Sequence, residues 1–386
     1  MFDCWKNVKN LKMKMLYVVD SVAVYGGIER VLIDKVNSLA ELYHYDISLV
    51  RVYQGNHMLP YSIAPSINQI DLQIPMHQQY EYSGISRLFK RYQLKIRLKS
   101  RFKKTIEELK PDIIVCVKLD FVGILIELKG SIPLIVESHT LCKMEKNESI
   151  GWLRRLYVKY LKRCIRNADA VVSLTEGDAA EWRTISNNVF VIPNVVNLNK
   201  SDYYSSCNKK SVIYVGRFSY QKDIDSLLQI WGKVHLCHPD WRLDIYGDGE
   251  LRDYYVDKIQ TMDANIFVFE PVENINEKYC EHSLLLLTSL YEPFGLVLPE
   301  AMSCGLPVVA FDCPYGPADI VTDGVDGFLI KDRNIISFVQ RVCQLIENND
   351  LRCQMGACGI CSSQRYCSDN IMPRWIKLFE SINLKI

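Results

Sequence analysis

The chain has 386 residues, of which 48% are hydrophobic and 24% charged, and these values are ordinary for a soluble globular protein. Its length is too great for one ordinary core and fits two domains of roughly 100–200 residues each. No apolar run reaches the ~18 residues that a bilayer-spanning helix needs, and the basic N-terminus lacks the apolar segment of a secretory signal. The sequence therefore predicts a cytoplasmic protein.

Short apolar runs alternate with longer amphipathic stretches along the first half of the chain. A buried strand is predicted at residues 15–20, a helix at 28–42 and an alternating strand at 45–53. Further short strands are expected at 112–117, 133–137, 169–174 and 189–192. Apolar runs of this length, bounded by turns and helices, indicate a parallel sheet that is covered on both faces.

The same pattern restarts after residues 193–210, a polar segment rich in Asn and Ser that we interpret as a linker. A strand is predicted at 211–215 and a helix at 224–235. Further strands are expected at 241–246, 265–269, 283–287, 307–311 and 327–330. The predicted fold class is therefore α/β, with two doubly wound, Rossmann-like domains that face each other across a cleft.

The predicted domains cover residues 1–195 and 196–370, and a C-terminal helix over 371–386 is expected to pack back on the first domain. The net charge of +1 conceals a difference between the two halves. Residues 1–195 carry 28 Lys and Arg against 20 Asp and Glu, whereas residues 196–386 carry 18 against 25. Such an asymmetry indicates that the two halves meet different partners.

The excess of positive charge is concentrated in two stretches. Residues 87–104 hold nine cations and no acid, and residues 151–166 hold six cations interleaved with Trp, Leu and Tyr. The second stretch is a candidate amphipathic helix. These stretches fit either solvated helix faces packed on a sheet or a surface for anionic lipid headgroups or a lipid-diphosphate acceptor. Nucleic acid is a weaker alternative, since no nucleic-acid fold signature accompanies the charge.

The 14 cysteines are best interpreted as reduced thiols, because most of them stand singly in apolar runs of a large chain. Cys358 and Cys361 have the spacing of half a zinc site within a cluster that also holds Cys353 and Cys367. No second such pair and no His follow, so we expect no zinc there.

Three segments carry residues suited to chemistry. Gly26 and Gly27 lie between the first strand and the first helix, where the backbone can approach an anion closely, although a plain tight turn explains them equally well. Gly216, Arg217 and Lys222 follow the first strand of the second half. Two cations at a strand's carboxyl end suit a diphosphate leaving group without a metal, and surface salt bridges are the alternative.

The third segment begins in a loop after the strand at 283–287 and continues into a helix. Glu292 lies in the loop, and Glu300 follows eight positions later, about two helical turns. Backbone N–H groups near residues 295–297 are placed to bind a phosphate, and the carboxylates suit sugar and ribose hydroxyls. A general acid and base pair for glycoside hydrolysis is disfavoured, because those two groups come from opposite sides of the bond.

These motifs occur in the same order as in the family-four retaining glycosyltransferases, which the chain resembles over nearly its whole length. The resemblance includes the linker-like residues 191–197 and is strongest over 211–330, where residues 313–330 look like members that build capsule, O-antigen or other lipid-linked surface glycans. It implies the GT-B fold and a metal-independent transfer of a hexose or N-acetylhexosamine, with retained configuration. The implied donor is a nucleotide diphosphate sugar, with a UDP-sugar favoured, and the implied acceptor is a glycan or a polyprenyl-diphosphate-linked sugar.

The resemblance also implies residue roles. Arg217 and Lys222 bind the diphosphate, Glu292 holds sugar hydroxyls, and Glu300 holds the ribose. His139, which alone would be an ordinary satisfied histidine, contacts the transferring sugar. The implied catalytic residues are His139, Arg217, Lys222 and Glu292. The implied donor-binding residues are Gly26, Gly27, Gly216, Arg217, Lys222, Phe269, Val272, Glu292, Phe294, Gly295, Leu296, Val297 and Glu300.

Two features depart from this family or compete with it. The family often has a glycine where this chain has residues 270–272, so the residues of the base pocket are not assigned by the resemblance. The acceptor region of the first half matches no known motif. Asp223 and Asp225 fit the metal-binding DxD pattern, but they start a helix, where Asp is expected as a cap, so we expect no metal or other cofactor. A nucleotide-sugar epimerase, a glycosyl phosphorylase and a non-catalytic sugar-nucleotide-binding protein are the alternative functions.

Overall fold

A computed structural model describes residues 13–23, 26–142, 152–199 and 203–384. The chain forms two compact units, one of Met1–Ser173, Ala179–Val191 and Arg374–Ile386, the other of Leu174–Asp178 and Ile192–Pro373. The chain enters the second unit slightly before the predicted boundary at residue 195. The predicted linker contacts the second unit, where the Asn199 N–H donates to Ser303 Oγ at 2.9 Å.

The first unit is built on a fully parallel sheet of seven strands in the order β3-β2-β1-β4-β5-β6-β7. The strands are β1 (Lys14–Val19), β2 (Asp46–Arg51), β3 (Asn68–Asp71), β4 (Ile113–Cys116), β5 (Leu134–Glu137), β6 (Ala170–Ser173) and β7 (Val189–Val191). The sequence predicted six of them. It missed β3, because this edge strand is half exposed and has no continuous apolar run.

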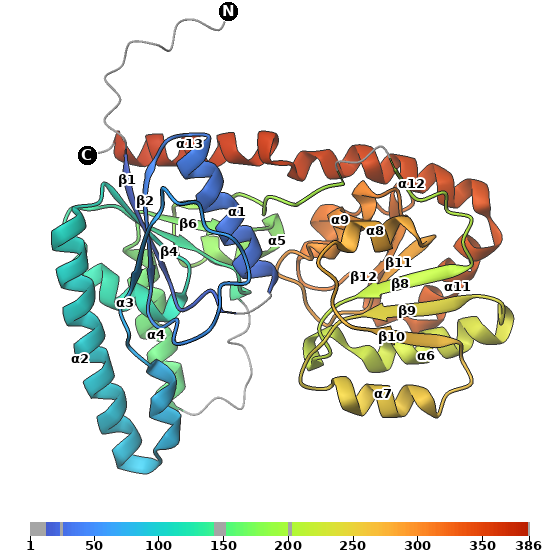
Figure 1. Ribbon diagram of the computed structural model, residues 1–386, viewed down its shortest axis with the longest axis horizontal. Coiled ribbons are helices and arrows are strands. Elements are labelled where there is room, and N and C mark those ends of the chain that lie inside the picture. The colour runs from blue at the N-terminus through green and yellow to red at the C-terminus, as the bar shows by residue number, and fades with distance from the viewer. Residues whose placement is uncertain (1–12, 24–25, 143–151, 200–202, 385–386) are drawn as a thin grey trace, which may run out of the picture. The chain divides into compact units, whose positions relative to one another are not determined.

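Helices cover both faces of this sheet (Figure 1). They are α1 (Gly27–Glu41), the short 3₁₀ helix η1 (Met76–Glu81), α2 (Gly84–Leu109), α3 (Leu119–Leu128), α4 (Trp152–Arg166) and α5 (Glu176–Arg183). One core cluster joins apolar residues of α2, α3 and α4 to alternate residues of the central strands, such as Leu16 and Val18 of β1. On α4 the apolar residues Leu161 and Ile165 belong to this core, so this basic helix packs on the protein with its apolar side.

The second unit has a six-stranded parallel sheet in the order β10-β9-β8-β11-β12-β13. The strands are β8 (Ser211–Val215), β9 (Arg242–Tyr246), β10 (Ile266–Phe269), β11 (Leu284–Leu287), β12 (Val308–Phe311) and β13 (Gly327–Ile330). The helices are η3 (Tyr220–Lys222), α6 (Ile224–Cys237), α7 (Arg252–Gln260), α8 (Ile275–Cys280), α9 (Val297–Ser303), α10 (Gly316–Ile320), η4 (Lys331–Arg333), α11 (Ile335–Glu347), α12 (Asn349–Ser363) and η5 (Gln364–Tyr366).

Strand β11 shows why these short strands are apolar throughout. Leu284 and Leu286 enter the core beneath α6 and α11, whereas Leu285 and Leu287 enter the core beneath α8 and α9. Successive side chains point to opposite faces of a sheet, so a strand with helices on both sides must be apolar at every position. The predicted α/β fold with two doubly wound parallel sheets is therefore confirmed.

The last helix, α13 (Ser368–Asn383), crosses from the second unit into the first at Arg374. Its Phe379 ring meets Tyr45 of the first unit edge to face, with 6.2 Å between the centroids. The part of α13 from Arg374 onward belongs to the first unit. Within the described ranges, no helix combines the length and apolar character needed to cross a membrane.

Candidate functional site

The order of strands in the second sheet defines where a ligand can bind. From β8 the chain moves outward through β9 and β10, then returns to the other side of β8 with β11. β8 and β11 are parallel neighbours, with Val212 opposite Leu284. The strand order therefore reverses between β8 and β11, and this position is the switch point of the sheet. The loops that follow these two strands diverge there, and ligands of open α/β sheets bind in the crevice between such loops. The loop after β8 contains Lys222, and the loop after β11 contains Glu292.

The loop after β8 is held by close backbone packing. A Cβ on Gly247 would lie 2.0 Å from the Gly216 carbonyl oxygen, and a Cβ on Gly249 would lie 2.7 Å from that of Phe218. The Phe218 N–H also donates to the Asp248 carbonyl at 2.9 Å. These two glycines after β9 were not predicted, although a Gly-x-Gly directly after a strand is a usable signal for a close backbone approach.

Lys222 and Glu292 meet at this switch point. Their side chains form an ion pair and are only 15% and 6% exposed. The hydroxyl of Ser289 donates to the same carboxylate at 2.6 Å. A backbone bond from the Glu292 N–H to the Pro314 carbonyl, 2.7 Å long, ties this loop to the segment after β12. One cation and one carboxylate are thus fixed side by side at the carboxyl edge of the sheet.

Arg217 occupies a different environment from Lys222. Its side chain is 67% exposed and forms an ion pair with the exposed Glu250, with 3.1 Å from Nε to the carboxylate oxygen. The surface ion pair considered as an alternative is therefore present for Arg217. An exposed pair of this kind contributes little to stability, so the Arg217 guanidinium can leave Glu250 and bind another anion at small cost in free energy.

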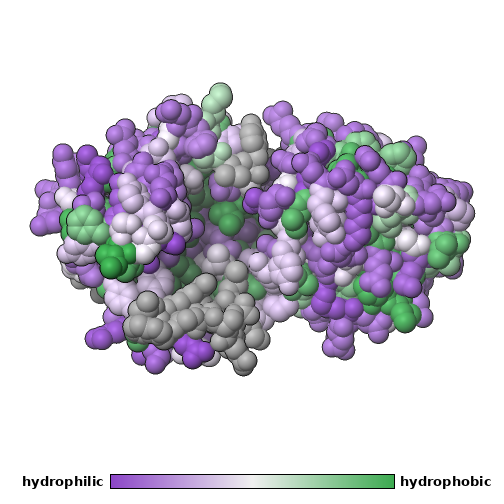
Figure 2. Space-filling model, turned by 90° about the horizontal axis from the view of Figure 1, so that it is seen from below, coloured by the Kyte–Doolittle hydropathy of each residue, from purple (hydrophilic) through white to green (hydrophobic). Residues whose placement is uncertain are grey.

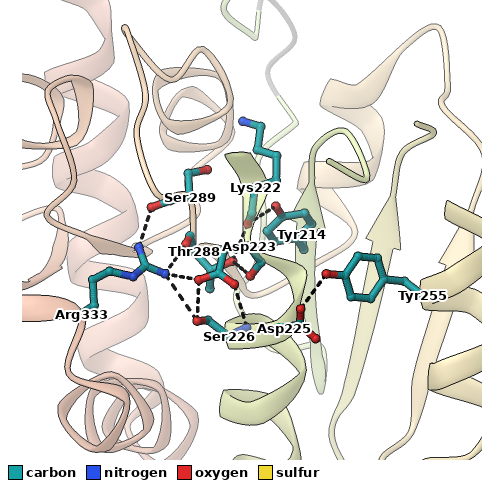
Figure 3. A network of polar contacts seen from close by, with 9 residues as sticks. All are labelled: Tyr214, Lys222, Asp223, Asp225, Ser226, Tyr255, Thr288, Ser289 and Arg333. Carbon is teal, nitrogen blue, oxygen red and sulfur yellow. Dashed lines mark hydrogen bonds and ion pairs between the residues drawn. The ribbon is translucent and has the colours of Figure 1, made fainter. Parts of the chain in front are cut away.

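A polar network behind Lys222 holds it in position (Figure 3). The hydroxyls of Thr288 and Tyr214 donate to the Lys222 carbonyl at 3.1 and 3.3 Å. Arg333 forms an ion pair with Asp223, the residue after Lys222, and donates to the Ser289 carbonyl at 2.8 Å. The guanidinium thus joins the loop after β8 to the loop after β11.

Arg333 also rests on an aromatic ring, since its guanidinium carbon lies 4.3 Å from the Phe311 centroid. Sequence reasoning missed this residue because it follows β13, far along the chain from the loops that it joins. The Lys222 side chain points away from the network in Figure 3, which leaves its ammonium group on the side of Glu292.

The two Asp residues of the DxD pattern have separate partners. Asp223 caps α6, because its carboxylate accepts from the Ser226 N–H at 3.2 Å, which confirms the predicted cap. Asp225 accepts from the Tyr255 hydroxyl at 2.8 Å and pairs with Lys258. Among the described residues, no group of three or more His, Cys, Asp or Glu side chains is placed to hold a metal.

The segment after Glu292 turns into α9, as the sequence predicts. Gly295 has φ of +94°, a conformation that favours glycine, and α9 begins at Val297, directly after Leu296. Glu300 is buried on α9, where the Tyr279 hydroxyl lies 3.4 Å from its carboxylate. The ribose and phosphate contacts assigned to this segment remain predictions.

The backbone around Phe294 leaves no space for a side chain at position 316, a glycine that was not predicted to matter. A Cβ on Gly316 would lie 1.7 Å from the Phe294 carbonyl oxygen. The Phe294 ring itself is buried and meets Tyr366 edge to face at 5.3 Å, so the ring is not available to a ligand. Any side chain at position 316 would displace the loop that contains Glu292.

Phe269 ends β10 and stacks on Tyr246, the last residue of β9, with 4.8 Å between the ring centroids. Phe269 and Val272 are each 37% exposed. Phe269 is the last residue of β10 and Val272 follows it, so both are at the carboxyl edge of the sheet, where the sequence predicts the nucleotide base. Their contact with a base remains a prediction.

In the first unit, Gly26 is the N-cap of α1, which begins at Gly27. A Cβ on Gly26 would lie 2.3 Å from a Glu29 carboxylate oxygen, which is the end of a flexible side chain that can move aside, so packing does not require glycine here. The first sheet reverses its order between β1 and β4, and Gly26 follows β1. The glycine pair therefore lies near the switch point of its own sheet.

His139 follows β5 and forms part of a buried triad. Its Nε2 lies 3.0 Å from the Glu137 carboxylate, which also pairs with Lys35 of α1. Burial acts to raise the pKa of Glu137, but the Lys35 cation and the His139 contact hold it at about 2. The sequence predicted His139 but neither partner, although a lysine on the inward face of an apolar helix was a signal for Lys35.

The triad is closed over by α13, because the Lys35 ammonium lies 4.1 Å from the Trp375 ring centroid. The Nδ1 atom of His139 is buried and has no hydrogen-bond partner among the described residues. A histidine whose one nitrogen is anchored to a carboxylate keeps a defined ring orientation, so its other nitrogen has a fixed direction.

Comparison with known proteins supplies the family. The model described as "Glycosyltransferase Family 4" matches residues 25–200, and that described as "Glycosyl transferases group 1" matches residues 197–359. The amylovoran biosynthesis glycosyltransferase AmsD of Erwinia amylovora is 28% identical over 372 residues, which is 94% of this chain and 98% of that protein.

Two solved structures share the fold. TarM of S. aureus, solved with fondaparinux, α-GlcNAc-glycerol and UDP, has a TM-score of 0.76 at 17% identity, covering 95% of this chain and all of that one. HepE of Anabaena, solved with UDP and glucose, has a TM-score of 0.73 at 20% identity, covering 96% of this chain and all of that one. The two family models together extend over residues 25–359, and the chain belongs to the group 1 and family 4 glycosyltransferases, with the GT-B fold.

Proposed function

We propose that this glycosyltransferase moves a hexose or N-acetylhexosamine from a nucleotide diphosphate sugar to a lipid-linked or other glycan acceptor in surface polysaccharide biosynthesis. The observation that supports it most is the Lys222–Glu292 pair at the switch point of the second sheet. AmsD is named for the biosynthesis of a polysaccharide, and UDP is the nucleotide in both similar structures, so we favour a UDP-sugar.

The proposed chemistry uses the charges at this edge. A lysine ammonium has three donors, so Lys222 keeps its bond to Glu292 while it donates to a phosphate oxygen. Arg217 leaves its exposed pair with Glu250 to bind the same diphosphate. Both cations stabilise the negative charge that develops as the bond between sugar carbon C1 and the phosphate oxygen breaks. We therefore propose a metal-independent reaction.

We further propose that the configuration at C1 is retained. The acceptor oxygen attacks from the face that the diphosphate leaves, and the departing phosphate oxygen takes the acceptor's proton. Glu292 accepts hydrogen bonds from donor sugar hydroxyls, and Glu300 accepts from the ribose. His139, whose ring is oriented by Glu137, contacts the transferring sugar. No nucleophile on the enzyme is required.

A cavity in the first unit supports an acceptor with an apolar part. It has a volume of about 200 Å³ and lies beside the residues that directly follow His139. Its lining is mostly apolar and includes Leu141, Leu161, Ile165 and Trp182. A mostly apolar cavity of this size suits a small apolar group, such as an isoprenoid segment would supply, better than a sugar.

We also propose that the protein works in the cytoplasm, at the inner face of the plasma membrane. Cys116 is a fully buried thiol in β4, and burial raises its pKa to about 12. Cysteines of this kind behave as small apolar core residues, and a chain rich in them suits a reducing compartment.

The test is a thermal-shift series with UDP-, GDP- and ADP-sugars, followed by product analysis. A ligand at 100 times its dissociation constant stabilises a protein by ~2.7 kcal/mol, so the preferred donor should raise the melting temperature clearly. NMR of the product made with a lipid-linked acceptor should show the donor's anomeric configuration. Inverted product would refute the mechanism, and turnover of the sugar nucleotide without acceptor would indicate an epimerase instead.

A further inference from the structure

Helix α2 is apolar on two sides, of which only one packs on the protein. Leu94, Leu98, Phe102 and Ile106 recur every four residues and are buried in the core of the first unit. A second set has the spacing i, i+3, i+4, i+7 and i+11, which places it on one face of a helix. This exposed stripe consists of Ile85, Leu88, Phe89, Tyr92 and Ile96.

The exposed stripe faces away from the protein. Its side chains are between 51% exposed, for Ile96, and 85% exposed, for Ile85. Tyr92 and Leu94 are two residues apart, so at about 100° per residue they point in nearly opposite directions. Figure 2 looks onto the end of the first unit where α2 begins and shows hydrophobic atoms there among hydrophilic ones. Scattered exposed apolar residues are ordinary, but a continuous stripe of five indicates a contact surface.

Positive charge surrounds the stripe. Residues 82–106 contain nine Lys and Arg and no Asp or Glu. By their helical positions, Lys90 and Arg97 flank the stripe on one side and Lys95 and Lys99 on the other. The carboxylates that pair with cations of α2 lie at its far end or on another helix, as for Lys103 with Glu107 and Lys99 with Glu127.

Aromatic residues extend the surface beyond the start of α2. Tyr80 and Tyr82 are 68% and 42% exposed. The Arg87 guanidinium lies 4.6 Å from the Tyr80 ring centroid, and the Lys90 ammonium lies 5.5 Å from that of Tyr82. Rings with a polar tip, held beside cations, match the interfacial layer of a bilayer, where apolar and charged groups meet.

We propose that α2 and the preceding 3₁₀ helix dock on a membrane surface that contains anionic lipid. The stripe is about 16 Å long and would lie in the plane of the interface, with its apolar side chains among the acyl chains and its cations on the headgroups. A second copy of the chain fits this surface less well, because pairing two such faces would place the cations of one copy against those of the other. Nucleic acid would leave five apolar side chains without an apolar partner.

The test is sedimentation of the full-length protein with vesicles, without nucleotide or acceptor, so its outcome stands apart from that of the proposed transfer. Vesicles of phosphatidylglycerol and phosphatidylcholine should bind the protein, and pure phosphatidylcholine should bind it about tenfold more weakly. Binding should also weaken as NaCl rises from about 0.05 to about 0.5 M. No binding to the anionic vesicles at low salt would overturn the proposal.

Two double variants locate the contact on α2. Ile85→Ser with Phe89→Ser, and Lys90→Gln with Arg97→Gln, should each weaken binding to the anionic vesicles about tenfold. The matched controls are Leu42→Ser with Met58→Ser, which are equally exposed apolar residues elsewhere on the unit, and Lys209→Gln with Lys233→Gln. Equal loss in the controls would overturn the assignment to α2.

The oligomeric state of the same variants distinguishes docking on a membrane from binding of a second copy of the chain. Sedimentation velocity of the wild type and of Ile85→Ser with Phe89→Ser should give one and the same mass. If the wild type is a dimer and this variant a monomer, the stripe binds a second copy and the membrane proposal is wrong.

Discussion

Each of the two sheets contains a lysine–glutamate pair at or near the carboxyl ends of its strands, and the two pairs differ in burial. Lys35 and Glu137 are 2% and 1% exposed, whereas Lys222 and Glu292 are 15% and 6% exposed. The first pair links α1 to β5 beneath Trp375, and the second links two loops at a switch point. The difference between the pairs is that packed elements hold the first one in a core, whereas loops hold the second at the edge of a sheet.

The third partner of each pair supports this division. Glu137 shares its carboxylate with His139, so the buried pair orients the ring of a buried histidine. Glu292 shares its carboxylate with Ser289, and Arg333 fixes the backbone carbonyl of that serine. We therefore expect mutations of the first pair to act mainly on folding, and mutations of the second pair to act mainly on transfer.

The largest expected effect is on catalysis by Lys222→Ala. Removing a cation that stabilises developing charge should lower kcat for sugar transfer about 10²–10³-fold, because the leaving diphosphate loses its partner. The melting temperature should fall less than in Lys35→Met, because Glu292 is less buried than Glu137 and keeps the hydrogen bond from the Ser289 hydroxyl. Lys258→Ala, which breaks the exposed pair with Asp225, is the matched control and should keep full activity. Full activity of Lys222→Ala would remove this residue from the site.

Next in size is the effect of Lys35→Met on folding. It leaves the Glu137 carboxylate buried without its cation, which should lower the free energy of unfolding by about 3–5 kcal/mol in urea titrations. The double variant Lys35→Met with Glu137→Gln removes both charges and should recover most of that loss. If the single variant is as stable as the wild type, the pair does not anchor the first core.

The buried pair also predicts a pH dependence. The folded pKa of Glu137, about 2, lies below its ordinary value of 4.5. The carboxylate therefore contributes stability that is present above about pH 4.5 and is lost as the pH falls toward 2, amounting to about 3 kcal/mol. Urea titrations at several pH values across this range should show that the free energy of unfolding declines less for the double variant with neutral residues at 35 and 137. An equal decline would assign the acid sensitivity to other groups.

The smallest expected effect is that of Arg333→Gln, which acts on the second pair from behind. Loss of the link between Asp223 and the Ser289 carbonyl should let Lys222 and Glu292 shift, and kcat should fall about tenfold. Arg341→Gln is the matched control, because Arg341 also stacks on a ring, that of Phe328, without contacting the loops. Arg333→Lys should restore little, since a lysine cannot make the forked contacts of arginine. An unchanged kcat in Arg333→Gln would exclude this positioning role.

Local sequence patterns predicted most of the fold. Short apolar runs, together with the alternating run at 45–53, located twelve of the thirteen described strands, because most of them are buried on both faces and such a strand must be apolar at every position. The half-exposed β3 lacks that pattern and was missed. In the candidate site, Lys222, Glu292 and Gly295 were identified because they are close in sequence to a strand end or a helix start.

The residues that hold those groups in place could not be predicted from the neighbouring sequence. Arg333 contacts Asp223 and Ser289 across large separations in the chain, and Gly316 is required only because the Phe294 backbone lies against it. Lys35 and Glu137 became a pair only when α1 and β5 packed together. The sequence alone determined which elements form and which loops contain charge, since periodicity and motifs are local. The tertiary structure decided which charges are buried together and which remain available, because burial depends on contacts between distant segments.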